Sequence, residues 1–234
     1  SCPNGYTHHD NKVAGSLTMD DTQSALEPQL EVLDLLSVDT VLSTTRSVRR
    51  KLDLSRPVEP EVLYECINLA TQAPMGLGGE SWRFLVVTDR ARKEKIAAIY
   101  KGMIMSLIED RGVDIKPTQH ALIERLPDMP ALIFVCIIGT PPGAEVSSQI
   151  GFYGSILPTA WSLMLALRSR NLGATWTSVL ASQQAKIGEI LEVPEGVVQT
   201  VMFPVAYTKG AKLKPAARQD ARELTYWNTW GNSE

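Results

Sequence analysis

Two short stretches carry residue types that suit a planar ligand with a phosphate. The first, Arg46-Ser47-Val48-Arg49-Arg50, lies in the densest positive run of the chain. Guanidinium groups and a hydroxyl bind phosphate oxygens, and alternate residues of an extended segment project to one side. This run is either a phosphate site or a solvated basic turn.

The second stretch is a glycine-rich loop at residues 73–82 (APMGLGGESW). Gly76, Gly78 and Gly79 allow backbone N–H and C=O groups to approach a flat ligand closely. The alternative is a flexible connection between a helix and a strand.

Signatures of other chemistry are missing from the sequence, which has no P-loop, no G-x-G-x-x-G, no G-x-S-x-G and no H-E-x-x-H. Only 3 histidines are present, too few to favour a triad or a metal centre. Cys2, Cys66 and Cys136 lack Cys-x-x-Cys spacing, which argues against a zinc site or a disulfide framework. We expect no metal, and chemistry carried by a cofactor.

The composition predicts a folded protein, because 44% of the 234 residues are hydrophobic and 21% are charged. Its net charge of −3 gives no positive field for nucleic acid or an anionic membrane. No basic segment followed by an apolar one begins the sequence, so we expect a cytoplasmic protein. Residues 1–28 read as a flexible arm or an expression remnant, and 29–234 as a single domain with a C-terminal extension.

Periodicity predicts the elements that must position these stretches. We expect a helix capped by Ser37, a helix from Pro60 to near Pro74 with Cys66 packed inside, and a buried strand at 131–138. Further strands are expected at 84–88, 174–179 and 197–205, and further helices at 90–108 and 183–191. The alternation predicts an α+β layered fold.

Residues 146–167 carry no charge and predict one long helix. Its length would cross a bilayer, but its serines, glycines and Pro158 favour a helix inside the protein. Because apolar residues occupy nearly every face, one sheet cannot cover it. We therefore expect a large homodimer interface and no membrane contact.

Together, these stretches resemble the FMN-dependent nitroreductase family over roughly residues 37–222. The resemblance rests on the ordered set of an R-S-x-R motif, an A-P-S-x-x-N-x-Q-P-W loop, a G-L-G segment before a strand and a late basic residue. It implies an α+β fold with a central mixed or antiparallel sheet flanked by helices, in an entwined homodimer with FMN sites across the interface.

The resemblance assigns the basic run to the cofactor. Arg46, Ser47 and Arg49 match the basic motif with which family members bind the FMN phosphate and ribityl chain. The last of these residues, Arg49, matches the one at the flavin N1/O2 edge, where a cation favours the anionic reduced flavin. Thr45 stands where many members have arginine, and Lys51 where many have phenylalanine. Arg218 matches the late basic residue at the phosphate, with Lys214 as a second candidate.

The resemblance places two further groups at the flavin ring. The loop residues Pro74, Met75, Gly76, Leu77 and Gly78, together with Ser155, match positions that face the partner subunit's flavin. The segment Trp176, Thr177, Ser178 and Val179 matches the one that passes the ring and gives a backbone N–H, at Ser178, to N5. Without the resemblance, Trp176 reads as a core residue.

The implied activity is ping-pong reduction. NADPH or NADH gives a hydride to flavin N5, and an electron-poor aromatic or quinone is then reduced without a side-chain acid or base. Open alternatives are enone reduction, reductive dehalogenation, flavin breakdown, or a flavin-sequestering or sensor protein. Residues 104–117 and Tyr226, Trp227 and Trp230 either line the acceptor pocket or pack on the partner subunit.

Overall fold

The computed structural model describes residues 33–76, 79–112 and 115–233. The chain divides into two units, Ser1–Asp34 and Leu35–Glu234, and every element of the described residues lies in the second. The predicted arm at residues 1–28 and the loop residues Leu77 and Gly78 lie outside the described ranges.

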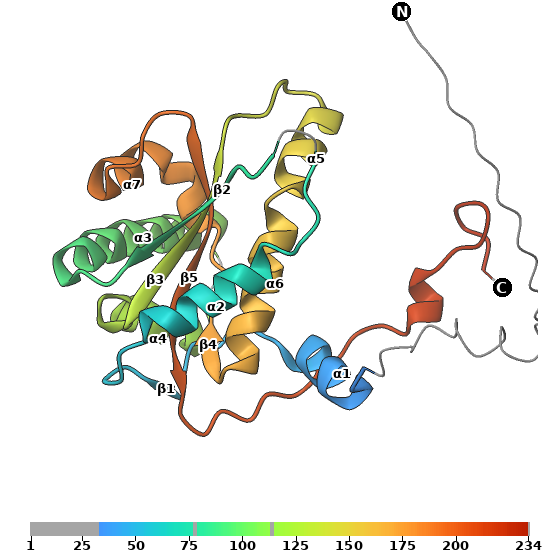
Figure 1. The fold of residues 1–234 in the computed structure, drawn as a ribbon, viewed down its shortest axis with the longest axis horizontal. Helices are drawn as coiled ribbons and strands as arrows, with labels where there is room; N and C mark the ends of the chain where they lie inside the picture. Colours follow the sequence, from blue (N-terminus) through green and yellow to red (C-terminus); the bar gives the residue numbers. More distant parts are fainter. Residues whose placement is uncertain (1–32, 77–78, 113–114, 234) are drawn as a thin grey trace, which may run out of the picture. The chain divides into compact units, whose positions relative to one another are not determined.

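The second unit is an α+β fold with an antiparallel sheet at its centre (Figure 1). The helices are α1 (Leu35–Thr44), α2 (Pro60–Ala70), α3 (Arg90–Arg111), α4 (Pro117–Arg125), α5 (Val146–Gly154), α6 (Leu157–Ser169) and α7 (Gln184–Leu191), with short turns η1 (Leu126–Asp128), η2 (Val179–Gln183) and η3 (Ala221–Leu224). The strands are β1 (Leu52–Asp53), β2 (Trp82–Val87), β3 (Ala131–Ile138), β4 (Leu172–Ala174) and β5 (Val197–Thr208), in the order β1-β5-β3-β2 with β4 also on β5. Each of these pairings is antiparallel.

Strand β3 is buried on both faces because helices cover both sides of the sheet. Ile133, Val135 and Ile137 pack in the cluster that contains α2 and α6. Phe134 and Cys136 alternate with them and pack in the cluster that contains α3, α4 and α7. This alternation with two buried faces explains why β3 reads as a continuous apolar run, and its predicted bounds at 131–138 are confirmed.

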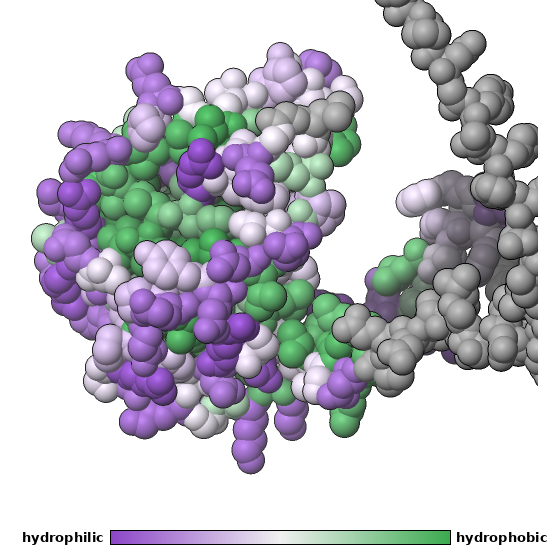
Figure 2. All heavy atoms as spheres, in the orientation of Figure 1, coloured by the Kyte–Doolittle hydropathy of each residue, from purple (hydrophilic) through white to green (hydrophobic). Residues whose placement is uncertain are grey.

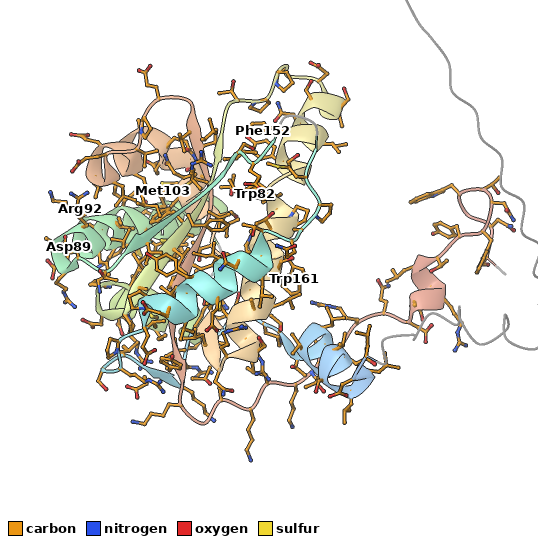
Figure 3. All side chains as sticks on the ribbon, viewed as in Figure 1. Trp82, Asp89, Arg92, Met103, Phe152 and Trp161 are labelled. Atoms are coloured by element: carbon orange, nitrogen blue, oxygen red, sulfur yellow. The ribbon has the colours of Figure 1, made fainter. Side chains whose placement is uncertain are left out.

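The expected cap at Ser37 is wrong, because α1 begins at Leu35 and Ser37 lies inside the helix. Local signals set two other helix starts as expected. Pro60 occupies the first turn of α2, where its missing N–H needs no partner. Asp89 caps α3 by accepting a hydrogen bond from the Arg92 amide at 2.9 Å (Figure 3). Helix α4 was not anticipated, because the sequence between 112 and 125 lacks a strong apolar period.

The single long helix expected at 146–167 is wrong, because the chain forms α5 and α6 with a break at Ser155 and Ile156. Pro158 causes the break, since it lacks the N–H that would bond to the Gly154 carbonyl and its ring clashes with that carbonyl. By length and composition alone, Val146–Ser169 is long and apolar enough to cross a membrane. Its second half is nevertheless a core helix, with residues such as Leu163 and Leu167 fully buried.

The strand expected at 174–179 is also misplaced, because β4 ends at Ala174. Beyond it only Thr177 bridges β5, at Met202. Between Ala174 and Thr177, the hydrogen-bonding groups of Thr175 and Trp176 bond to residues 47–48 instead of β5. The Thr175 hydroxyl donates to the Val48 carbonyl at 3.0 Å, and the Trp176 amide donates to Ser47 Oγ at 3.2 Å.

Candidate functional site

The basic run lies along the outer edge of β4 and continues past it. The Val48 amide donates to the Ala174 carbonyl at 2.9 Å, which adds to the two bonds at Thr175 and Trp176. Three hydrogen bonds therefore join residues 47–48 to residues 174–176. They hold the segment extended, so that Val48 is buried while Arg46 and Arg49 stay accessible.

This close approach requires glycine at position 173. A Cβ on Gly173 would lie 2.7 Å from Leu52 Cδ2 and 3.1 Å from both Val48 Cβ and Thr208 Cγ2. The end of the Leu52 side chain can move away, but Val48 and Thr208 would each have to shift by a few tenths of an ångström, so a side chain here would strain the contact between the basic run and β4. Gly173 thus fixes where the run lies, a role that sequence analysis did not assign.

A cavity of about 710 Å³, here named the basic cavity, opens beside this run. It is lined by Leu42, Ser43, Thr45, Arg46, Ser47, Trp161, Met164, Trp176, Pro215, Ala216 and Arg218. Its size is typical of a cofactor pocket. The structure therefore gathers Arg46, Ser47, Trp176 and Arg218, which are far apart in the sequence, around one cavity.

Two contacts hold the walls of the basic cavity. Arg46 Nη1 donates to the Lys214 carbonyl at 3.3 Å and ties the C-terminal segment to the basic run. Trp176 is half-buried and packs edge to face on Phe203, with ring centroids 5.6 Å apart. Trp176 is thus partly a core residue and partly a wall of the cavity.

Among residues 176–179, the backbone amides differ in availability. The Trp176 amide donates to Ser47 Oγ and the Thr177 amide to the Met202 carbonyl. The amide of Ser178 has no acceptor among the described residues, and Ser178 is exposed. Of these three N–H groups, only the one at Ser178 is free to donate to a ligand.

Arg49 is half-buried and is not among the described residues that line the basic cavity. It forms no ion pair within the described part of the chain. Burial raises the pKa of Tyr100 on α3, and the positive charge of Arg49 opposes that rise. An arginine with no carboxylate partner keeps its full charge for an anionic ligand.

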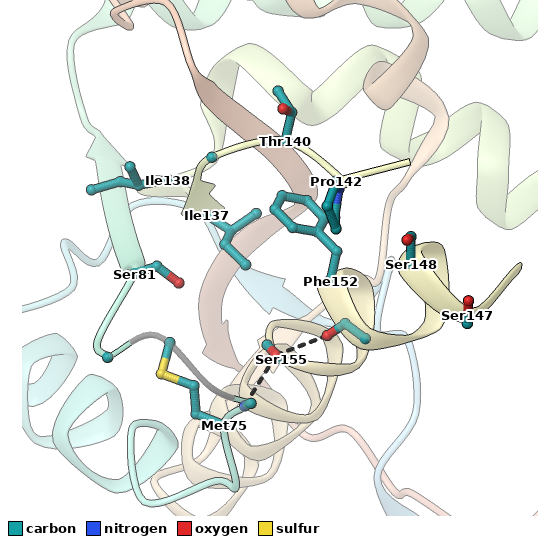
Figure 4. Close-up of a pocket in the computed structure, with 14 residues that line it drawn as sticks. Met75, Ser81, Ile137, Ile138, Thr140, Pro142, Ser147, Ser148, Phe152 and Ser155 are labelled. Atoms are coloured by element: carbon teal, nitrogen blue, oxygen red, sulfur yellow. Dashed lines mark hydrogen bonds between the residues drawn. The ribbon is translucent and has the colours of Figure 1, made fainter. Parts of the chain in front are cut away.

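The glycine-rich loop is anchored by the residue at the break between α5 and α6 (Figure 4). Ser155 Oγ accepts from the Gly76 amide at 3.1 Å and donates to the Gly151 carbonyl at 2.9 Å. The Ser155 carbonyl accepts from Trp82 Nε1 at 2.8 Å. Ser155 therefore holds both ends of the loop, and a Cβ on Gly76 would come within 2.8 Å of its hydroxyl.

A second cavity, here named the glycine-loop cavity, lies between this loop, the end of β3 and α5, with a volume of about 700 Å³. Its lining residues are Met75, Gly76, Gly79, Ser81, Ile137, Ile138, Gly139, Thr140, Pro142, Ser147, Ser148, Gly151, Phe152 and Ser155. Figure 4 shows Phe152 and Met75 on its walls. None of these described lining residues carries a charge, so the cavity suits a neutral, largely apolar ligand.

The sequence-predicted site residues thus fall into two groups. Arg46, Ser47, Trp176 and Arg218 line the basic cavity, which α6 also lines, whereas Arg49, Thr177, Ser178 and Val179 are not among its described lining residues. Met75, Gly76 and Ser155 line the glycine-loop cavity with α5, and exposed Pro74 precedes them. The two cavities share no lining residue, so one chain does not bring the two groups together.

Sequence analysis missed several lining residues. Trp161 lines the basic cavity and Phe152 the glycine-loop cavity, but the sequence shows them only as part of the uncharged stretch at 146–167. The end of β3 and residues 139–142 gave no signal, because they enter the cavity only when β3 and α5 are placed in space.

Comparison with models of protein families shows to which family the chain belongs. The family model described as the nitroreductase family matches residues 42–207, most of the chain. The chain belongs to the nitroreductase family. This membership makes it a nitroreductase-family flavin oxidoreductase, and the predicted family and fold are confirmed.

Two relatives in sequence span most of this nitroreductase-family chain. A Methanothermobacter thermautotrophicus protein named as an NADH dehydrogenase/NAD(P)H nitroreductase is 25% identical over 202 residues, covering 85% of this chain and 86% of the relative. The iodotyrosine deiodinase of Thermotoga neapolitana is 21% identical over 175 residues, covering 74% of this chain and 90% of that protein.

Solved structures share the fold. Oxidized iodotyrosine deiodinase bound to FMN and 3-iodo-L-tyrosine superposes with a TM-score of 0.64 at 21% identity, covering 83% of this chain and 100% of that one. The NADPH:FMN oxidoreductase of Vibrio harveyi in complex with NAD⁺ gives 0.63 at 14% identity, covering 85% and 79%. At these identities the likeness shows the fold alone.

Proposed function

We propose that this nitroreductase-family protein is an FMN-dependent oxidoreductase that takes electrons from NAD(P)H and reduces nitroaromatic or quinone acceptors. The observation that carries the proposal is the convergence of Arg46, Ser47, Trp176 and Arg218 on the basic cavity. Two guanidinium groups and a hydroxyl suit a phosphate, and an indole suits the edge of a planar ring. Sequence relatives named as NAD(P)H nitroreductases support the same electron donor.

The chain's own residues fit FMN in their chemistry. Bound FMN would supply the hydride chemistry at its N5 atom. Arg46, Ser47 and Arg218 would hold the phosphate, and the free amide of Ser178 would donate a hydrogen bond at N5. Arg49, which has no carboxylate partner among the described residues, would place a positive charge at the pyrimidine edge and stabilise negative charge there.

We infer that each active site is completed by a second copy of the chain. The glycine-loop cavity and the basic cavity are separate in one chain, and the glycine-loop group is the one expected to face a partner's flavin. Large apolar side chains also stand open on α1, α5 and α6, among them Leu36, Ile150 and Trp161. Figure 2 shows such green apolar surface among the purple polar groups on the face in view. A dimer interface would cover these side chains.

The uncharged glycine-loop cavity supports a neutral acceptor. Phe152 offers an aromatic face, Met75 a polarizable sulfur, and the hydroxyls of Ser81, Ser147 and Ser148 polar contacts for oxygen substituents. Reductive dehalogenation is the second candidate, since iodotyrosine deiodinases are among the relatives. An amino-acid substrate carries two charges, and the described lining residues of this cavity offer neither a carboxylate nor a cation to pair with them.

The cofactor and donor are tested first by spectroscopy. The purified protein is expected to show a flavin spectrum that bleaches with NADPH under anaerobic conditions and recovers when nitrofurazone is added. Bound flavin that does not bleach would favour a sequestering or sensor protein. No flavin, even after reconstitution with FMN, would overturn the proposed function.

The shared site is tested by mixing two inactive variants. Arg46→Ala weakens the basic group, and Gly76→Val displaces the loop from Ser155. If each site needs both chains, refolding the two variants together restores about a quarter of wild-type activity, because half of the dimers are mixed and each has one intact site. Mixtures that stay inactive while forming mixed dimers would contradict the shared site.

A further inference from the structure

A second basic depression lies next to the basic cavity, between residues 46–51 and residues 211–214, with Thr118 of α4 at its edge. Its volume is about 550 Å³. It is here named the cation cleft for the charged side chains that line it: Arg46, Arg49, Arg50, Lys51, Lys212 and Lys214. No carboxylate is among its described lining residues.

The walls of the cation cleft are fixed by hydrogen bonds between its two segments. Lys51 Nζ donates to the Gly210 carbonyl at 3.4 Å, and the Lys209 amide donates to the Lys51 carbonyl at 2.7 Å. At the other end, Arg46 Nη1 donates to the Lys214 carbonyl. These bonds keep like charges together although they repel one another.

None of the six cations of the cleft forms an ion pair in the part of the chain that the structure describes. The protein as a whole has a net charge of −3, so this concentration of positive charge is local. A cleft lined by one sign of charge raises the local concentration of ligands of the opposite sign. The cleft is therefore suited to a polyanion.

FMN alone does not account for this charge. A phosphate monoester carries about two negative charges near pH 7, and Arg46 with Arg218 can neutralise them. With Arg49 at the pyrimidine edge, Arg50, Lys51, Lys212 and Lys214 still line the cleft without an assigned anion. An anion with more than one phosphate group would balance this remaining charge.

We propose that the cation cleft binds the 2′-phosphate ester of NADPH and so makes NADPH, rather than NADH, the preferred donor. This inference rests on the proposed function, because it assigns the donor of the same site. The two dinucleotides differ only by that phosphate. Arg50 and Lys212, one on each wall, are the residues that discriminate between them.

The test uses FMN-loaded protein and two inert ligands that differ by the same phosphate. Calorimetry is expected to show adenosine 2′,5′-bisphosphate binding about tenfold more tightly than adenosine 5′-monophosphate, the effect of one charge-assisted contact. Arg50→Ala and Lys212→Ala together should remove this difference and raise the KM for NADPH but not for NADH. Lys186→Ala, an exposed lysine on α7, is the matched control and should change neither.

Three outcomes would overturn the inference. The first is equal binding of the two adenosine ligands to the wild-type protein. The second is an unchanged preference in the Arg50→Ala, Lys212→Ala variant. The third is loss of FMN from that variant, which would make the cleft part of the flavin phosphate site. Because the adenosine ligands do not react, these results stand apart from failure of the proposed activity, which would show as no NAD(P)H oxidation.

Discussion

Replacing Gly173 with alanine should separate the basic run from β4. The new Cβ would meet Leu52 Cδ2 at 2.7 Å and Val48 Cβ at 3.1 Å. Leu52 can move its side-chain end, but Val48 Cβ is fixed to a backbone that donates its amide to Ala174 at 2.9 Å. The substitution must therefore stretch that hydrogen bond or shift residues 46–49.

The magnitude follows from two opposing effects. Overpacking of this kind costs about 1–3 kcal/mol. Alanine also restricts the unfolded chain, which returns about 0.4–1 kcal/mol. We expect a net loss of about 1–2 kcal/mol in the free energy of unfolding, and for a chain of this length a fall in Tm of about 2–4 °C per kcal/mol.

The assay compares this variant with Gly188→Ala in α7, where an added Cβ has no neighbour nearer than 3.8 Å. That control should gain about 0.5–1 kcal/mol, because alanine is preferred inside a helix. FMN affinity, measured by quenching of flavin fluorescence, should fall about tenfold in Gly173→Ala if the displaced arginines lose one charge-assisted contact. An unchanged FMN affinity together with the loss of stability would refute the link between Gly173 and the cofactor site.

Three further predictions concern other parts of the fold. Ser155→Ala removes two hydrogen bonds at the loop and should cost about 1–2 kcal/mol in urea unfolding, whereas an unchanged midpoint would contradict its role as an anchor. The hydrogen bond from Tyr207 lowers the pKa of Glu59 below 4.5, so its stabilisation is present above that pH and lost as pH falls through the lowered pKa. Tyr207→Phe should thus be less stable than wild type at pH 7 and approach it in acid, and a pH-independent difference would argue otherwise. Burial raises the pKa of Cys136 to about 12 and also raises that of Cys66, so neither thiol should be labelled in the native protein at pH 8, as peptide mapping would reveal.

Sequence patterns predicted some elements from one local signal, although the capping signal at Ser37 was wrong because α1 begins at Leu35. The bounds of β3 followed from an uninterrupted apolar run, and the start of α2 from Pro60. The uncharged stretch at 146–167 predicts one helix, but Pro158 divides it at Ser155 and Ile156. The error at residues 175–179 has another cause. The hydrogen bonds of Thr175 and Trp176 go to Val48 and Ser47, more than a hundred positions away in the sequence, which no local pattern reveals.

The candidate site, like the fold, could be predicted from the sequence only in part. The residue types of the basic run and the glycine loop were evident in the sequence, and the family resemblance gave them roles. The structure was needed to show which of these groups are free to bind a ligand. Only the spatial arrangement shows that the amides of Trp176 and Thr177 are already bonded while that of Ser178 is free. Likewise, only the fold places Lys212 opposite Arg50.

The division of the site between two cavities gives the break between α5 and α6 a role in positioning. Ser155 sits in that break and holds the glycine loop against α5, while α6 continues to the wall of the basic cavity at Trp161 and Met164. An unbroken helix would leave no free backbone carbonyl at Ser155 for Trp82, since that carbonyl would bond within the helix. The helix break caused by Pro158 therefore fixes the loop that the proposed shared site assigns to a second chain, and the α5–α6 pair links the two halves of that proposed site. Disturbing the break should impair acceptor reduction more than FMN binding, because FMN contacts are expected mainly at the basic cavity.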